Sequence, residues 1–240
     1  MRKYSRFIVF LCLHIACCFN AFSQKQKLKN QPYADQKLFH FGFTVGVNAQ
    51  DIILSHSGAV SNRNEVWFSE VPSYSPGFSV GIIADRYINS HMNLRVIPSI
   101  HFGERRFAFR EQNASSVDKD QDFPIKSNYL SLPIHMRFSS ERLNNIRPYI
   151  LAGGFINTEI GNKSEPIIKY KSLDYGIDIG IGCNLYFPLF KMSPELRFSF
   201  GLKDIIEHDR SDLRDQSLVK YTDAIQSGKS RMITLTFNFE

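Results

Sequence analysis

Ser99 and His101 are the two residues of this sequence that most resemble a nucleophile and its base. Alternate residues of an extended strand share one face, so this spacing puts a hydroxyl and an imidazole side by side. A catalytic triad also needs an acid that orients the imidazole, and none stands at a convincing strand position beside the pair. We therefore interpret Ser99 and His101 as members of a hydrogen-bond network, with a hydrolase as the alternative.

Other signs of catalysis or cofactor binding are weak. The sequence has no glycine pattern of a nucleophile elbow, no phosphate-binding loop and no His-x-x-x-His pair. His208 and Asp209 could contact a metal, but two residues in a long connection are a poor basis for a metal site. We predict no catalytic residue, no cofactor and no metal site.

Ionisable side chains recur at the centres of segments that read as strands. The polar network that we predict consists of Arg95, His101, His135, Arg137, Asp178, Glu195 and Arg197. These charges could line a conducting pore. Charges in a narrow interior must pair or remain hydrated, so we expect a salt-bridged interior instead.

The segments that carry these residues alternate apolar and polar side chains with a period of two, which indicates strands. Eight such segments cover residues 39–48, 77–85, 92–103, 129–138, 148–157, 173–187, 195–202 and 233–239. The pattern is clearest in 173–187, where Ile177, Ile179 and Ile181 oppose Asp178 and Gly180. It is least regular in 148–157, where Tyr149, Leu151 and Phe155 oppose Ile150, Ala152, Gly154 and Ile156.

Strand length and glycine placement favour a membrane barrel over a soluble sandwich. Most segments have about ten residues, which is the length that a tilted membrane-spanning strand needs. Glycines gather on the polar face, at positions 42, 46, 77, 81, 176, 180 and 182. A small barrel has little room inside, whereas glycine on a solvated face would only weaken the strands. We predict an all-β, eight-stranded antiparallel up-and-down transmembrane β-barrel, apolar outside and polar inside.

The connections between segments alternate in length. Long ones cover 49–75, 104–126, 158–172 and 203–230, and short ones cover 86–91, 139–147 and 188–193. Outer-membrane barrels have short periplasmic turns and longer outer loops. We therefore expect a barrel in the outer membrane with both termini in the periplasm.

The first 23 residues resemble a secretory signal peptide. Arg2, Lys3 and Arg6 precede an apolar run over 7–19, and Ala21 and Ser23 fit a cleavage site before Gln24. A lipoprotein signal ending at Cys17 or Cys18 is the alternative, but His14 stands where such a signal prefers Leu. We expect a signal peptide over 1–23, a periplasmic arm over 24–37 and a barrel over 38–240.

Charge and cysteine content exclude several classes of function. Cleavage would remove three of 29 basic residues and none of 23 acidic ones, so the formal net charge would fall from +6 to +3. This small excess of positive charge argues against nucleic acid as a partner, because a nucleic-acid-binding protein needs a concentrated basic patch. Cys183 would be the single remaining cysteine, which cannot form an internal disulfide.

Two exposed regions could contact other molecules. The short 139–147 connection carries Arg142, Asn144, Asn145 and Arg147, whose donors form a candidate partner surface; the asparagines could equally just satisfy turn geometry. The Glu104-Arg105-Arg106 run at the outer rim could bind lipopolysaccharide phosphate, although charges there are commonly just interfacial.

An ordered set of motifs resembles the PorT family of the type IX secretion and gliding machinery. The likeness covers about residues 38–240. It includes the runs LFHFGFTVGVN from Leu38, PGFSVGI from Pro76, LRVIPSIHFGER from Leu94, RLNNIRPYILAGG from Arg142, DIGIGC from Asp178, PELRFSFGL from Pro194 and LTFNFE from Leu235. Single barrel strands are generic, but the ordered set, with the RLNNIRPY stretch among its motifs, is fairly specific; the long connections match least.

The resemblance implies a non-enzymatic outer-membrane protein needed to export proteins that carry a C-terminal sorting domain. It implies other secretion-system proteins as partners, next to outer-membrane lipid and lipopolysaccharide, and it supplies no catalytic residues. The alternatives are a barrel enzyme acting on lipid A and a small adhesin or passive porin.

Overall fold

The computed structural model describes residues 30–57, 67–70, 75–111, 121–160, 169–210, 222 and 225–240. The expected signal peptide and residues 24–29 of the arm lie outside this part. A short 3-10 helix, η1 (Ala34–Gln36), precedes the first strand. The strands are β1 (Phe39–His56), β2 (Trp67–Glu70), β3 (Ser75–Asn89), β4 (Met92–Val96), β5 (Ser99–Phe102), β6 (Glu104–Glu111), β7 (Gln121–Lys126), β8 (Tyr129–Ser139), β9 (Ile146–Glu159), β10 (Leu173–Tyr186), β11 (Lys191–Gly201) and β12 (Ile225–Phe239).

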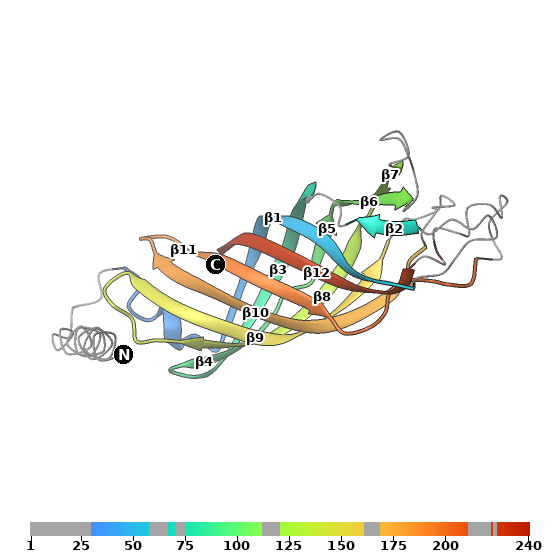
Figure 1. Ribbon diagram of the computed structural model, residues 1–240. Coiled ribbons are helices and arrows are strands. Elements are labelled where there is room, and N and C mark those ends of the chain that lie inside the picture. The colour runs from blue at the N-terminus through green and yellow to red at the C-terminus, as the bar shows by residue number, and fades with distance from the viewer. Residues whose placement is uncertain are drawn as a thin grey trace, which may run out of the picture.

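The main sheet closes into a ring of antiparallel strands (Figure 1). The order is β1-β12-β11-β10-β9-β8-β4-β3, and β3 pairs with β1 to close the ring. Strands β4 and β5 occupy one position, because both pair with β3 on one side and β8 on the other. The ring therefore has eight positions, which confirms the predicted eight-stranded antiparallel barrel.

Apolar side chains cover the outside of this ring and polar ones fill its interior. Ile179 is 49 % exposed, whereas the preceding Asp178 on the same strand is 2 % exposed. The same contrast recurs around the barrel, since Phe41, Ile82 and Ile150 are exposed on other strands. A membrane barrel shows this inverted distribution because its outer solvent is lipid.

The third predicted segment is divided at Ile97 and Pro98, between β4 and β5. Proline has no N–H and cannot donate to a sheet ladder. The wall nevertheless stays connected, because the Pro98 carbonyl accepts a hydrogen bond from Ile82 N–H at 3.0 Å. The interruption therefore does not open the barrel at this point.

The irregular alternation of 148–157 has a packing explanation in β9 and β10. Tyr149, Leu151 and Phe155 are buried in the lumen, although they are large. Gly182 lies opposite Tyr149 in the register, and a Cβ there would come within 2.4 Å of the tyrosine ring. Gly176 likewise lies opposite Phe155 and would come within 2.6 Å of its ring. Glycines on β10 thus make room for the aromatic rings of β9.

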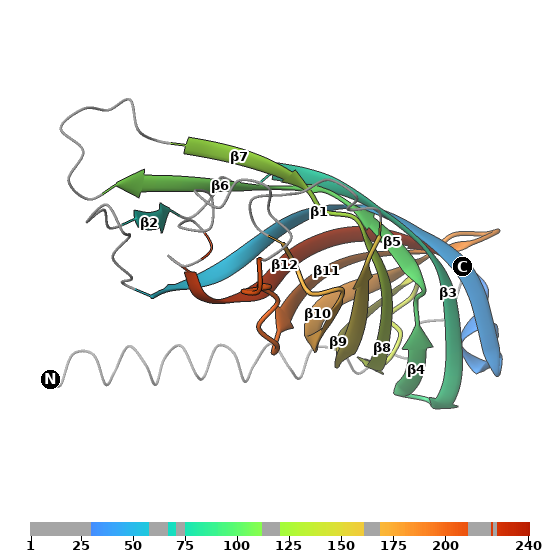
Figure 2. The same cartoon turned by 90° about the vertical axis from the view of Figure 1, so that its right-hand side faces the viewer.

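The long connections contain strands that the sequence does not predict. Residues 104–126, expected as a loop, hold the hairpin of β6 and β7, which forms a separate three-stranded sheet with β2. Figure 2 shows this hairpin projecting beyond the barrel wall. Strand β1 also runs on to His56 and pairs with the early part of β12. Among the described residues, no helix has the length and apolar character to cross a membrane.

Replacing Ile179 by arginine tests the assignment of the outer face. Because this side chain points away from the lumen, Ile179→Arg should lower the free energy of unfolding by about 2–4 kcal/mol near the bilayer midplane. Urea titration of the protein refolded in lipid vesicles measures this change. Ile179→Val is the control and should be nearly neutral; an arginine variant as stable as the wild type would place Ile179 inside.

Candidate functional site

A buried cluster of charges around Arg95 lies inside the barrel, toward the end that carries the short connections. Arg95, on β4, is 0 % exposed and donates from Nε to Asp85 Oδ2 at 2.8 Å. Its guanidinium also pairs with the Glu240 carboxylate and lies 3.9 Å from Glu195. One arginine thus connects three carboxylates that come from β3, β11 and the end of the chain.

Further basic groups neutralise these carboxylates. Lys191 Nζ lies 2.8 Å from Glu240 Oε2, and Arg137 Nη2 lies 3.3 Å from Asp85 Oδ2. The backbones of Lys191 and Glu240 also exchange two hydrogen bonds, at 2.7 and 2.9 Å. Glu240 therefore closes the cluster with both its side chain and its main chain.

Tyrosine and histidine side chains extend the cluster to neighbouring strands. Tyr149 donates its hydroxyl to Glu195 Oε2 at 2.8 Å, and the Arg137 guanidinium lies 5.0 Å from the tyrosine ring centre. His135 Nε2 lies 2.7 Å from Asp178 Oδ2. We call the whole set the lumen network: Asp85, Arg95, His135, Arg137, Tyr149, Asp178, Lys191, Glu195, Arg197 and Glu240.

The structure brings together most of the interior residues that the sequence singles out. Arg197 reaches Glu195 at 4.0 Å, and Arg95 reaches it at 3.9 Å. Four network members are not singled out by the sequence reasoning: Asp85, Tyr149, Lys191 and Glu240. For Glu240 a signal is present, because Asn238, Phe239 and Glu240 continue the alternation that places every second residue inside.

His101 belongs to a separate chain of hydrogen bonds in the lumen, nearer the end that carries the long connections. Its Nδ1 lies 2.8 Å from Ser79 Oγ, and its Nε2 lies 3.1 Å from Ser99 Oγ. Asn48 Nδ2 donates to Ser79 Oγ at 2.7 Å. Among the described residues, no carboxylate hydrogen-bonds to this imidazole. The pair of Ser99 and His101 therefore lacks the acid that a triad requires.

The candidate partner surface of the 139–147 connection is engaged within the chain. Arg142 Nη1 donates to the Gln31 carbonyl at 2.9 Å, and Arg142 Nη2 donates to the Asn30 carbonyl. Arg147 donates to the carbonyls of Ser140 and Ser90. These guanidinium groups therefore hold the protein's own backbone, which differs from the free donors that the sequence suggests.

Asn144 and Asn145 have different roles in this connection. Asn144 has φ 57°, a left-handed conformation that asparagine tolerates well, so it serves the turn geometry. Asn145 Oδ1 accepts a hydrogen bond from Asn30 N–H at 3.1 Å. The first asparagine shapes the turn and the second binds the segment before β1.

Residues 30–37, which we call the strap, lie across the short-turn end of the barrel. Asp35 lies 3.1 Å from Arg147 Nη1 and 3.7 Å from Arg142 Nη1, and it accepts the Tyr186 hydroxyl. The Arg142 guanidinium stacks 3.5 Å from the centre of the Tyr186 ring. The strap leads into β1, and β1 is opposite β9 in the ring. Asp35 of the strap nevertheless contacts Arg142 and Arg147, which lie at the start of β9 and in the connection before it. The strap therefore crosses the opening.

At the other end of the barrel, Asp204 holds the connection that follows β11. Partial burial alone would raise the pKa of its carboxyl. The N–H groups of Gly228 and Ile206 and the Lys171 ammonium outweigh this effect and hold the pKa below its usual value. His208 Nε2 lies 3.6 Å from the same carboxylate. No group of three His, Cys, Asp or Glu suited to a metal occurs in the described part of the chain.

The closed ring, its exposed apolar band and its polar lumen define an outer-membrane β-barrel. Residues 22–207 match the family model described as outer membrane protein beta-barrel domain, and the chain belongs to this family. No curated protein matches the sequence.

Several solved structures are similar to this chain at low sequence identity. Neisserial surface protein A is 12 % identical with a TM-score of 0.43, over 84 % of this chain and 98 % of that one. OprG from Pseudomonas aeruginosa is 12 % identical with a TM-score of 0.44, over 84 % and 93 %. The attachment invasion locus protein Ail of Yersinia pestis is 13 % identical with a TM-score of 0.38, over 83 % and 96 %. Such distant similarity transfers no function to this chain.

Substitution of Arg95 tests the dependence of the barrel on the lumen network. Arg95→Met leaves Asp85 and Glu240 buried without their main partner, so the free energy of unfolding should fall by about 3–5 kcal/mol. Denaturant unfolding in detergent micelles measures this loss. Arg86→Met, at an exposed arginine of the preceding strand, is the matched control and should change it by less than about 0.5 kcal/mol. Equal effects of both variants would contradict the central role of Arg95.

Removal of the Asp35 carboxylate tests how the strap is held. Asp35→Ala deletes the acceptor shared by Arg142, Arg147 and Tyr186, so amide hydrogen exchange in 30–37 should accelerate about tenfold or more. Exchange followed by mass spectrometry measures the protection. Glu141→Ala, at an exposed carboxylate of the adjacent connection, should leave it unchanged. Unaltered protection in Asp35→Ala would show that the backbone contacts of Asn30 and Gln31 suffice.

Proposed function

We propose that this protein is a non-enzymatic component of type IX protein secretion. It would act in the export of proteins with C-terminal sorting domains by holding partner proteins at the outer membrane. The ordered set of motifs from Leu38 to Glu240 that resembles the PorT family supports the system. The barrel's architecture supports a holding role over transport or catalysis.

The observation that carries this proposal is the filled and charge-paired lumen. The largest side chains with less than 2 % exposure include Arg95, His101, His135 and Glu195, all inside the barrel. Arg95 pairs with Asp85 and Glu195, and His135 pairs with Asp178, so translocation of a solute would have to break these buried contacts. This arrangement favours a closed scaffold over a passive porin.

The absence of an oriented acid beside His101 disfavours the enzyme alternative for the described residues. Both imidazole nitrogens are occupied by serine hydroxyls, and His101 is 1 % exposed. A lipid substrate would have to enter the lumen to reach Ser99. We therefore assign this group a structural part in the barrel interior.

Both ends of the barrel chain would face the periplasm in this proposal. The strap, the short connections and the end of β12 share one end of the barrel, opposite the long connections. The strap and the 139–147 connection together form an ordered surface there. An ordered surface loses less entropy on binding, which suits the docking of other secretion-system proteins.

An adhesin remains the second candidate because of the sheet of β2, β6 and β7. This sheet extends from the long-connection end of the barrel, where a membrane protein meets the exterior (Figure 2). A surface of this kind could contact another cell. The two functions differ in whether export of other proteins depends on the chain.

A deletion strain complemented with point variants tests the proposal. Deletion should abolish export of proteins with C-terminal sorting domains, and the Ser99→Ala and His101→Ala variants should restore it in full. Lipid A composition, measured by mass spectrometry, should be the same in all strains because no catalysis is involved. Heat-modifiable gel mobility serves as the control for barrel assembly.

Two results would contradict the proposal. Normal export in the deletion strain, with reduced attachment to cells or surfaces, would favour the adhesin. A change in lipid A that Ser99→Ala fails to reverse would favour the enzyme.

A further inference from the structure

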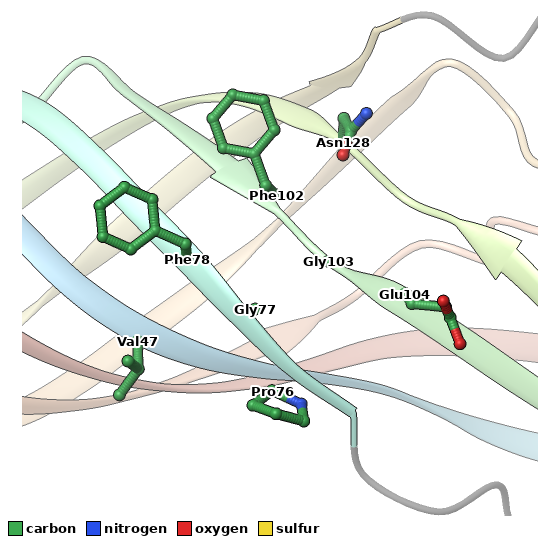
Figure 3. A pocket seen from close by; sticks show the side chains of 8 residues that line it. All are labelled: Val47, Pro76, Gly77, Phe78, Phe102, Gly103, Glu104 and Asn128. Atoms are coloured by element: carbon green, nitrogen blue, oxygen red, sulfur yellow. The ribbon is translucent and has the colours of Figure 1, made fainter.

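Two regions outside the lumen network could bind another molecule. The first is a groove in the outer wall of the barrel (Figure 3). Its apolar side chains, Val47, Phe78 and Phe102, are 45–53 % exposed and belong to the membrane-facing band. Contact with acyl chains is general for such a band, so this groove points to no particular ligand. The second region is the place at the short-turn end where the barrel holds the strap.

The strap is bound through its main chain, as a peptide ligand would be. The Arg142 guanidinium donates to two successive carbonyls of the strap, from Nη1 to Gln31 at 2.9 Å and from Nη2 to Asn30. Asn145 Oδ1 accepts a hydrogen bond from the Asn30 N–H at 3.1 Å. Every peptide has such main-chain groups, so these contacts recognise a peptide without selecting its side chains.

Two side chains of the strap connect it to the end of β10. Asn30 Nδ2 donates to the Tyr186 carbonyl at 2.9 Å, and Gln31 Nε2 donates to the Phe187 carbonyl at 3.0 Å. The strap therefore lies between the connection before β9 and the end of β10. A peptide in this place contacts two separate parts of the barrel rim at once.

A subsite for a carboxylate lies beside the main-chain contacts. Asp35 lies 3.1 Å from Arg147 Nη1 and 3.7 Å from Arg142 Nη1, and it accepts the Tyr186 hydroxyl. The side chains of Arg142 and Arg147 are only 5 % and 7 % exposed. Hydrogen bonds between a guanidinium and a carboxylate are stronger than neutral ones, so two nearly buried cations favour an acidic group here.

The barrel itself orients both guanidinium groups. Arg142 Nε donates to the Asn144 carbonyl at 2.8 Å. Arg147 Nε donates to the Ser140 carbonyl at 2.9 Å, and its Nη2 donates to the Ser90 carbonyl. The strap takes no part in these contacts, so the site is ordered independently of it. A preorganised site of this kind loses less entropy when it binds a peptide.

The strap has little apolar packing to hold it in this site. None of its residues is buried, and Tyr33 is 74 % exposed. Gln31 has φ 46°, a left-handed conformation that is unfavourable for glutamine. Polar contacts and the covalent link to β1 therefore hold the strap, and a second peptide with the same polar groups could take its place.

We propose that the strap occupies a binding site for an acidic peptide segment of a partner protein, which replaces the strap when it binds. This rests on the proposed function, because holding partner proteins at the outer membrane needs a surface that accepts them. A protein is the occupant because the site recognises main-chain carbonyl and N–H groups together with a carboxylate. The strap is covalently linked and therefore has a high effective concentration, so it competes with the partner segment.

Binding of a synthetic strap peptide tests the site. The probe is an acetylated, fluorescent peptide of residues 28–38, titrated against the full barrel protein in detergent micelles and followed by fluorescence anisotropy. Asp35→Ala in the barrel weakens its own strap, so this variant should bind the peptide at least about tenfold more tightly than the wild type. Glu141→Ala, at an exposed carboxylate of the adjacent connection, is the control and should bind the peptide as the wild type does.

Two further changes test the carboxylate subsite. A peptide that carries Asp35→Ala should bind the Asp35→Ala barrel about tenfold more weakly than the unchanged peptide, because it lacks the charged acceptor. Tyr186→Phe, added to the Asp35→Ala barrel, removes only the hydroxyl that donates to the carboxylate and should lower the affinity about threefold to tenfold. Gel mobility after heating verifies that each variant forms the barrel.

Three results would overturn the proposal. Equal affinity of the wild-type and Asp35→Ala barrels for the peptide would show that the strap does not compete for the site. Equal affinity of the two peptides would exclude the carboxylate subsite. Dimers of the Asp35→Ala barrel that the peptide dissociates, detected by light scattering, would assign the site to the strap of a second copy. None of these readouts depends on export, so failure of the proposed function would leave them unchanged.

Discussion

The ion pairs of Arg95 link parts of the chain that are far apart in sequence. Asp85 stands ten residues before this arginine, while Glu195 and Glu240 stand 100 and 145 residues after it. Every one of these groups is removed from water, so none of them can lose its partner without a large cost. The lumen network thus ties β3 and β4 directly to β11 and to the end of β12, across the barrel interior. The backbone ladders hold neighbouring strands, and this network holds strands that are not neighbours.

The shape of the interior follows from the need to fit this network and the rings of β9 into one narrow lumen. Tyr149 reaches Glu195 only because Gly182 leaves space beside its ring. Phe155 occupies the corresponding space above Gly176. The lipid face has no comparable requirement, since any apolar side chain is compatible with acyl chains. The two faces of each strand are therefore under very different packing constraints.

Period-two alternation predicts most of the barrel from sequence because each residue's face is a local property. The alternation of neighbouring residues correctly predicts that Ile179 faces outward and Asp178 faces the lumen. It also correctly places Ser99 and His101 on the same face. Which charges meet cannot be predicted in this way. The contact between Lys191 and Glu240 depends on the register of β11 and β12. The contact of Tyr149 with Glu195 crosses the intervening strand β10 and depends on two registers. The hairpin of β6 and β7 is not predicted, because the charged residues of 104–126 favour the assignment of this segment as a loop.

The contacts of the strap could not be predicted from periodicity either, because its short polar sequence has no repeating pattern. It has a mechanical consequence for the barrel. A pulling force on the chain before Asn30 acts first on the hydrogen bonds of Asn30 and Gln31. These bonds reach the connection before β9 and the end of β10. The load then reaches Asp35 and its arginines before it reaches the ladder between β1 and its neighbours. The strap contacts thereby protect β1 from being separated from its neighbouring strands. A force applied at the N-terminal side of the strap is transmitted to the opposite wall of the barrel, at β9 and β10.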